Sequence, residues 1–209
     1  MTTQTQPPRT AAWLVNLFAT GEDAESILGD LLEEYSQLAS QLGAPVARRW
    51  FWRQTVKTIA HLSGTTFRVA PWSLAATVIG GFLLQSFGNE LPEKVIAAVA
   101  DRHLAYCRTH FDAYMFWMTD GILIGRVMVS MFVGGVVAAA ARDREMVATI
   151  TLGLIFCTLI GAAVVWVAMY RQMDVAWMVW SCADPVAIVV GGAIIRTQRS
   201  AVTPRASEV

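Results

Sequence analysis

Three formally charged side chains, Asp120, Arg126 and Asp184, lie inside long apolar runs. A charge in the hydrocarbon of a membrane is costly, so such residues face the interior of a helix bundle or a water-filled cavity. An arginine and an aspartate can pair there and hold two helices together. Carboxylates at such depths can instead carry protons, ions or substrate, as they do in transporters. Pairing is the favoured interpretation, because only two acids are present and one of them has an arginine within reach.

The histidines and cysteines suggest no enzymatic or metal site. His103 and His110 lie seven residues apart and could share a helix face, but no cysteine or serine motif accompanies them as a nucleophile. The three cysteines are widely spaced and form no CxxC or Cys/His ligand pattern. We therefore expect no catalytic residue, no metal and no cofactor. Because 16 basic residues balance 16 acidic ones, we also expect no nucleic-acid partner.

The elements that must position these side chains are four predicted membrane spans. Charged residues make up only 15% of the 209-residue chain, against about 25% in soluble domains. The apolar runs predict spans over residues 71–87, 113–140, 146–169 and 175–195. At about 1.5 Å per residue, Asp120, Arg126 and Asp184 then lie about 10, 20 and 14 Å below the outer ends of their spans. Arg126 on the second span is long enough to reach Asp184 on the fourth.

Small residues predict how closely the spans pack. Gly121-x-x-x-Gly125 allows two helix backbones to approach each other. Three Gly-Gly pairs also lie within the apolar runs, at residues 80–81, 134–135 and 191–192. We expect these positions to pack against this chain's own helices and not to form a dedicated dimer face.

The first third of the chain predicts an amphipathic helical hairpin. Apolar residues recur at three- and four-residue steps between Ile27 and Leu42, after an approximate capping box at Thr20 and Asp23. Gly43, followed by Pro45, ends this helix. A second helix is expected over residues 46–62, with cations at four-residue steps beside three adjacent aromatic residues, Trp50, Phe51 and Trp52. These aromatics either lie at the membrane interface or pack against the preceding helix.

Basic residues predict the orientation. Ten lysines and arginines near the span ends fall on one side of the membrane and four on the other. The larger set belongs in the cytoplasm, so both termini are expected there, in the cytoplasmic membrane of a bacterium. The predicted fold is all-α, an integral membrane four-helix bundle behind a cytoplasmic amphipathic hairpin. Its expected divisions are a disordered tail over 1–10, the hairpin segment over 11–69, the membrane domain over 70–196 and a cytoplasmic tail over 197–209.

Two N-terminal motifs resemble a known family. ILGDLLEEY over residues 27–35, then Gly43 and ARRWFWRQ over residues 47–54, resemble the permease prefix domain. That segment precedes the membrane core of bacterial ABC-type permeases related to macrolide exporters. The resemblance covers about residues 11–62, and the chain has neither the family's long periplasmic domain nor a GxxxxGK[ST] nucleotide-binding loop. It implies a cytoplasmic helical module beside the membrane, not transport by this chain alone.

These observations together predict a non-enzymatic membrane protein, an accessory, regulatory or interaction subunit of a transporter-like assembly. The alternatives are a small stand-alone transporter that uses the three intramembrane charges, or a structural subunit of a larger membrane complex. The expected partners are membrane lipid and either another protein or a second copy. Acids of the first hairpin helix either pair with arginines of the second or stay free for a partner. The candidate docking residues are Asp30, Glu33, Glu34, Tyr35, Arg48, Arg49, Trp50, Trp52 and Arg53.

Overall fold

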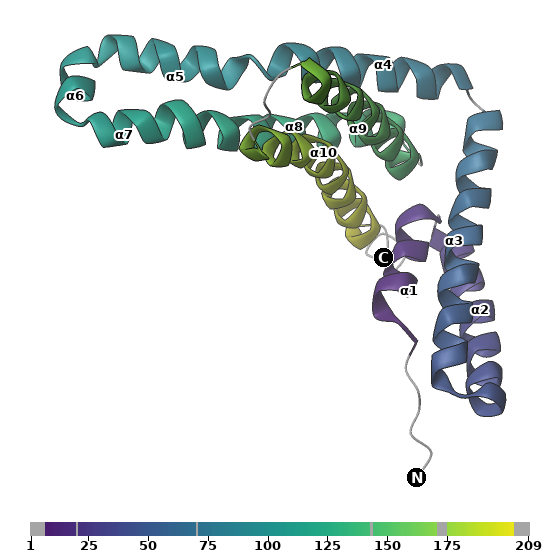
Figure 1. The fold of residues 1–209 in the computed structure, drawn as a ribbon. Helices are drawn as coiled ribbons and strands as arrows, with labels where there is room; N and C mark the ends of the chain where they lie inside the picture. The colour runs from purple at the N-terminus through teal and green to yellow at the C-terminus, as the bar shows by residue number, and fades with distance from the viewer. Residues whose placement is uncertain (1–6, 20, 70, 143, 171–174, 203–209) are drawn as a thin grey trace. The chain divides into compact units, whose positions relative to one another are not determined.

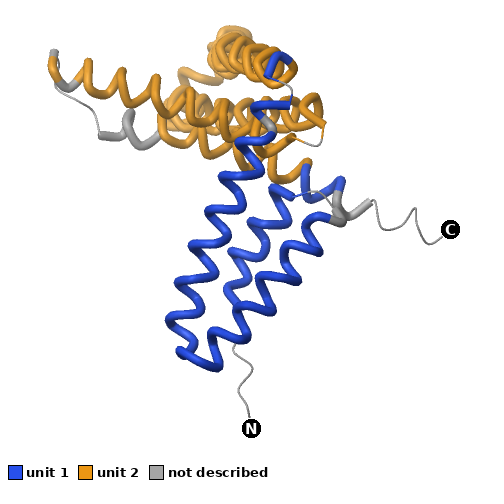
Figure 2. Tube along the Cα trace, turned by 90° about the vertical axis from the view of Figure 1, so that its right-hand side faces the viewer, with its two compact units in different colours: residues 1–72, 196–209 blue, residues 73–195 orange. Residues whose placement is uncertain are grey.

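The described part of the chain is all-α, as expected (Figure 1). The structure is a computed structural model that describes residues 7–19, 21–69, 71–142, 144–170 and 175–202. The chain divides into two compact units (Figure 2). Unit 1 comprises residues 1–72 and 196–209, and unit 2 comprises residues 73–195.

Unit 1 contains three N-terminal helices that lie side by side (Figure 2). They are α1 (Arg9–Phe18), α2 (Gly21–Leu42) and α3 (Ala44–Val69). The end of α2 is as predicted, because Gly43 adopts a φ of 87°, a left-handed conformation that glycine tolerates at a helix end. The structure differs from two expectations. Helix α1 begins at Arg9, inside the tail expected over residues 1–10, and α3 continues beyond residue 62 to Val69. Thr20 of the expected capping box lies outside the described residues.

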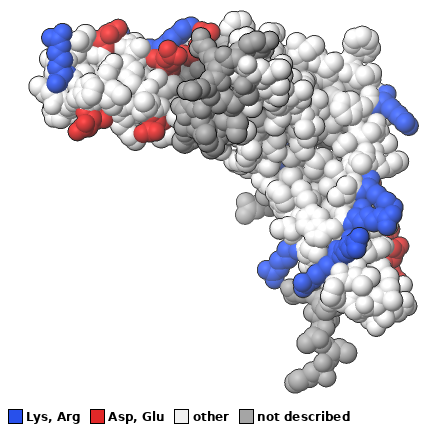
Figure 3. Space-filling view, in the orientation of Figure 1, with Lys and Arg blue, Asp and Glu red and all other residues white. Residues whose placement is uncertain are grey.

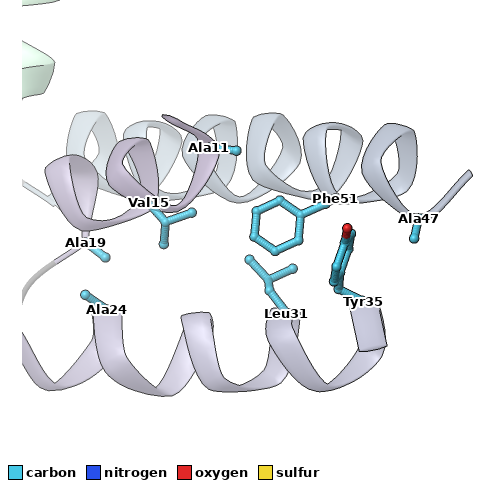
Figure 4. Close-up of a cluster of buried hydrophobic side chains, with 8 residues drawn as sticks. All are labelled: Ala11, Val15, Ala19, Ala24, Leu31, Tyr35, Ala47 and Phe51. Atoms are coloured by element: carbon cyan, nitrogen blue, oxygen red, sulfur yellow. The ribbon is translucent and has the colours of Figure 1, made fainter. Parts of the chain in front are cut away.

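The core of unit 1 is built around an aromatic pair. Tyr35 of α2 and Phe51 of α3 are both almost fully buried, with ring centroids 5.7 Å apart and an edge-to-face angle of 84°. Aliphatic side chains of α1 and α2 close the cluster around them (Figure 4). The three adjacent aromatics of α3 therefore divide: Phe51 is core, Trp50 packs half-buried against it, and Trp52 is exposed.

Unit 2 contains a long helical hairpin and two further helices. Its first arm is α4 (Pro71–Gly88) and α5 (Leu91–Arg102), and α6 (Leu104–Thr109) closes the turn. The second arm is α7 (Phe111–Phe116), the π-helix η1 (Trp117–Gly121) and α8 (Ile122–Ala141), which returns beside the first (Figure 1). Residues 88–112, which separate the first two predicted spans, are thus largely helical. The remaining helices are α9 (Glu145–Tyr170) and α10 (Val175–Val202), and α10 belongs to unit 2 up to Ile195.

Two helices are long and apolar enough to cross a membrane, Phe111–Ala141 and Glu145–Val167. A third candidate results if Ala44–Val69 and Pro71–Arg102 count together as one broken span. These candidate spans are counted among the described residues only. Within the predicted fourth span, residues 175–180 have no described side chains, so that span remains a prediction.

Four helices contribute to one core in unit 2. Its buried side chains are all aliphatic and come from α4, α8, α9 and α10. They are Leu74 and Val78 of α4, Val133 and Val137 of α8, Val147, Ala148 and Leu152 of α9, and Ile188 of α10. Packing density of this kind leaves little room for added atoms. The helices of unit 2 approach one another closely at this core.

Glycines provide that close approach. A Cβ atom at Gly134 of α8 would overlap the backbone carbonyl of Ile188, and one at Gly191 of α10 would overlap that of Met131. The GxxxG motif packs instead against α5, because Cβ atoms at Gly121 and Gly125 would lie 3.5 Å from Ile96 and 2.6 Å from Pro92, respectively. The predicted packing among the chain's own helices is therefore confirmed at these positions.

Candidate functional site

The predicted ion pair between Arg126 and Asp184 is present. An Nη2 atom of Arg126 on α8 donates to Oδ2 of Asp184 on α10 at 2.9 Å. The Asp184 side chain is only 7% exposed, and that of Arg126 is 33% exposed. The two helices meet about two turns farther along, at Gly134 and Gly191. The long arginine side chain therefore spans a crossing that the glycines hold close.

The ion pair belongs to a larger polar network. Ser130 lies four residues after Arg126, on the same face of α8, and donates from Oγ to Oδ1 of Asp184 at 3.2 Å. Gln85 of α4 is fully buried and donates from Nε2 to Ser130 Oγ at 2.7 Å. The same Nε2 donates to Oδ1 of Asn89 at 2.7 Å. The network therefore joins α4, α8 and α10.

The charge on Asp184 sets the donor and acceptor of each hydrogen bond between Asp184, Ser130 and Gln85. An ionised carboxylate only accepts, so Ser130 must donate its single hydroxyl hydrogen to it. Ser130 can then only accept from its other neighbour, which requires the amide nitrogen of Gln85 on that side. Within the described residues, Gln85 Oε1 and Arg126 Nε are buried without a hydrogen-bond partner. The directions of the Ser130 and Gln85 hydrogen bonds therefore follow from the negative charge of Asp184.

Asp120 is not part of this network. It lies in η1, its side chain is exposed, and α8 begins two residues later at Ile122. The 20 residues of α8 rise about 30 Å, which matches the hydrocarbon thickness of a bilayer. The candidate span Phe111–Ala141 nevertheless begins before α8 and contains Asp120 near its first residues. Of the three charges predicted inside the membrane, Arg126 and Asp184 therefore form a pair, and Asp120 is exposed outside it.

The candidate docking residues of unit 1 are mostly exposed, with two exceptions. Tyr35 is 2% exposed and belongs to the core, so it is not available as a docking contact. Trp50 is half-buried against the same core. Among the residues that the structure describes, no ion pair joins the acids of α2 to the arginines of α3, so the salt-bridged form of the hairpin is not observed. The exposed candidates are Asp30, Glu33, Glu34, Arg48, Arg49, Trp52 and Arg53.

Exposed residues on one face of α3 form a stripe with two arginines between two valines. Val46 and Val56 are 48% and 61% exposed, and Arg49 and Arg53 are exposed between them. Spacings of three and four residues place these four side chains on one helix face, and we call them the α3 stripe. The opposite face of α3 carries the buried residues Ala47 and Phe51. Basic side chains also gather on the face of unit 1 visible in Figure 3.

Over the described part of the chain, no three histidine, cysteine, aspartate or glutamate side chains converge as a metal site would require. In comparisons with known proteins, no family model, no curated protein and no solved structure matches the chain.

Proposed function

We propose that this chain is a non-enzymatic integral membrane protein that presents unit 1 in the cytoplasm as a docking module for another protein. In this proposal the helices of unit 2 anchor the module, and the assembly it joins is transporter-like, as the prefix-domain resemblance implies. The observation that carries the proposal is the α3 stripe. Its two arginines and two valines face outward from a helix whose opposite face is already committed to the core.

The composition of the stripe favours a protein partner. Stable interfaces combine apolar contact with charged groups around it, and arginine is enriched among their contact residues. Arg49 and Arg53 make no ion pair within the described residues, so their charges remain free to meet an acidic surface. The two valines would supply the apolar contact beside them.

The polar network of unit 2 favours an anchoring role over transport. Asp184 already accepts from both Arg126 and Ser130, so its charge is neutralised by fixed groups. A coupling carboxylate must instead exchange its proton or ion with a pathway. A paired, buried network is better suited to fix which helix faces meet.

Co-purification with matched variants tests the docking role. Tagged protein is extracted from the native membrane in mild detergent, and its partners are quantified by mass spectrometry. We expect a stoichiometric protein partner whose recovery falls about tenfold in Arg49→Gln/Arg53→Gln, which corresponds to a loss of about 1.4 kcal/mol. Arg68→Gln, an exposed arginine at the end of the same helix, is the control and should retain the partner.

Two results would overturn this proposal. One is a partner that binds the double variant and the control equally, since the stripe would then be a solvated face. The other is a double variant that loses only co-purified anionic lipid, with no protein partner in either sample. In that case the arginines meet lipid headgroups, the interfacial alternative for this helix.

A further inference from the structure

The helical hairpin of unit 2 forms a partly open apolar cavity that no part of the polar network lines. The cavity lies between α5, α6, α7 and η1 and has a volume of about 530 Å³. Its walls are aliphatic on the α5 side, at Val95 and Val99, and aromatic on the returning side, at Tyr114 and Trp117. Sites for small molecules have volumes of this order and walls of this kind.

Local geometry of the chain creates this space. In η1 the helix takes on the wider π turn, a feature often found at functional sites. Gly121 ends η1, and a Cβ atom there would lie 2.7 Å from the ring of Trp117, so glycine leaves room for that ring on the cavity side of the helix. At the far end, Tyr106 stacks on His110 with centroids 4.2 Å apart and closes the tip.

The surroundings of the cavity indicate what it holds. Val95, Val99, Phe111 and Trp117 are exposed, so the apolar lining is continuous with an apolar outer surface of the hairpin. Aromatic residues beside a membrane span are typical of the headgroup region. The hairpin continues directly into α8, within a helix long and apolar enough to span. A lipid acyl chain can therefore reach the cavity from the bilayer.

Charge at the tip indicates the headgroup. Residues 101–110 hold two arginines, Arg102 and Arg108, against one aspartate. Both arginines are exposed, form no ion pair within the described residues, and are next in sequence to the lining residues His103 and Cys107. Guanidinium groups bind phosphate through paired hydrogen bonds. We propose that the hairpin binds an anionic phospholipid, with an acyl chain in the cavity and the phosphate against Arg102 and Arg108.

Photo-crosslinking of the full chain tests this site. The protein is reconstituted in phosphatidylcholine nanodiscs that contain a trace of phosphatidylglycerol with a photoreactive acyl chain. After irradiation, labelled peptides are quantified by mass spectrometry, with labelling of α9 as the internal reference. We expect labelling of residues 95–117 to exceed that of α9 at least threefold. Ala100→Trp, which fills the cavity from α5, and Ala113→Trp, which fills it from α7, should each abolish that excess.

Controls separate the acyl chain from the headgroup. Ala98→Trp places the same ring on the exposed side of α5 and should leave the labelling unchanged. Arg102→Gln/Arg108→Gln should remove the preference for the phosphatidylglycerol probe over the equivalent phosphatidylcholine probe. Hairpin labelling no greater than that of α9 in the unaltered protein would overturn the proposal. Equal labelling by both probes in the unaltered protein would overturn the assignment of an anionic headgroup.

Discussion

Arg126→Leu is expected to destabilise the protein by about 3–5 kcal/mol, because it leaves the buried Asp184 carboxylate without its cationic partner. Ser130 would then be the remaining donor to a side chain that is 7% exposed. Asp184→Asn in the same chain should recover most of this loss, since the amide is neutral and still offers an acceptor to Ser130. Thermal unfolding and monodisperse yield in detergent measure both effects.

An exposed arginine provides the control for that pair of variants. Arg68→Leu removes a cation from the end of α3 and should change stability by less than about 0.5 kcal/mol. Equal stability of Arg126→Leu and the double variant would contradict a structural role for the pair. A double variant that folds normally is also the protein in which the transporter alternative can be examined.

Gly134→Ala and Gly191→Ala are expected to destabilise unit 2 by about 1–3 kcal/mol each, the usual cost of overpacking a dense core. The added Cβ atom would overlap a backbone carbonyl of the facing helix, at Ile188 or Met131, and a backbone cannot rotate away as a side chain can. The two helices would have to separate, and the Arg126–Asp184 pair between them would lengthen. Thermal unfolding of the purified protein measures the loss.

Glycines in open space reverse the expected sign. At Gly80 of α4 and Gly161 of α9, an added Cβ atom would have no neighbouring atom within 4 Å. Alanine is better than glycine in a helix by up to about 1 kcal/mol, so Gly80→Ala and Gly161→Ala should be neutral or stabilising. The same substitution thus has opposite effects at crossing and open positions. Destabilisation of equal size at all four positions would contradict the direct backbone contact.

Much of the local structure follows from the sequence. Apolar periodicity predicts α2, and the glycine with positive φ at its end explains why it stops at Leu42. Long apolar runs predict helices over the four expected spans, and the structure shows helices there in α4, α8, α9 and α10. The pairing of Arg126 with Asp184 was also predictable, because a buried charge needs a partner and few were available. Helix periodicity, helix-ending glycines and charges within apolar runs can all be recognised in a single sequence.

Long-range packing was harder to predict. Ser130 and Gln85 join the network from two different helices, and their signal, a polar residue inside an apolar run, gives no direction of contact. Tyr35 was named as a candidate docking residue, although it lies on the apolar stripe of its helix, and the structure buries it against Phe51. The cavity lies between α5 and the returning α7, with the short helix α6 at one end and the π turn η1 at the other, and neither α6 nor η1 has a distinct sequence pattern. Such features depend on which faces meet in three dimensions.

Membrane topology is the property on which both the docking role and the lipid site depend. It is tested by thiol labelling in intact bacterial cells, with Cys107, Cys157 and Cys182 replaced by serine. Single cysteines are then introduced at two exposed positions, Ser40→Cys on α2 and Ala105→Cys on α6. A membrane-impermeant maleimide should label position 105 in intact cells and position 40 only after the cells are permeabilised. Labelling of both positions in intact cells, or of neither, would contradict a cytoplasmic unit 1 anchored by spans on either side of the hairpin.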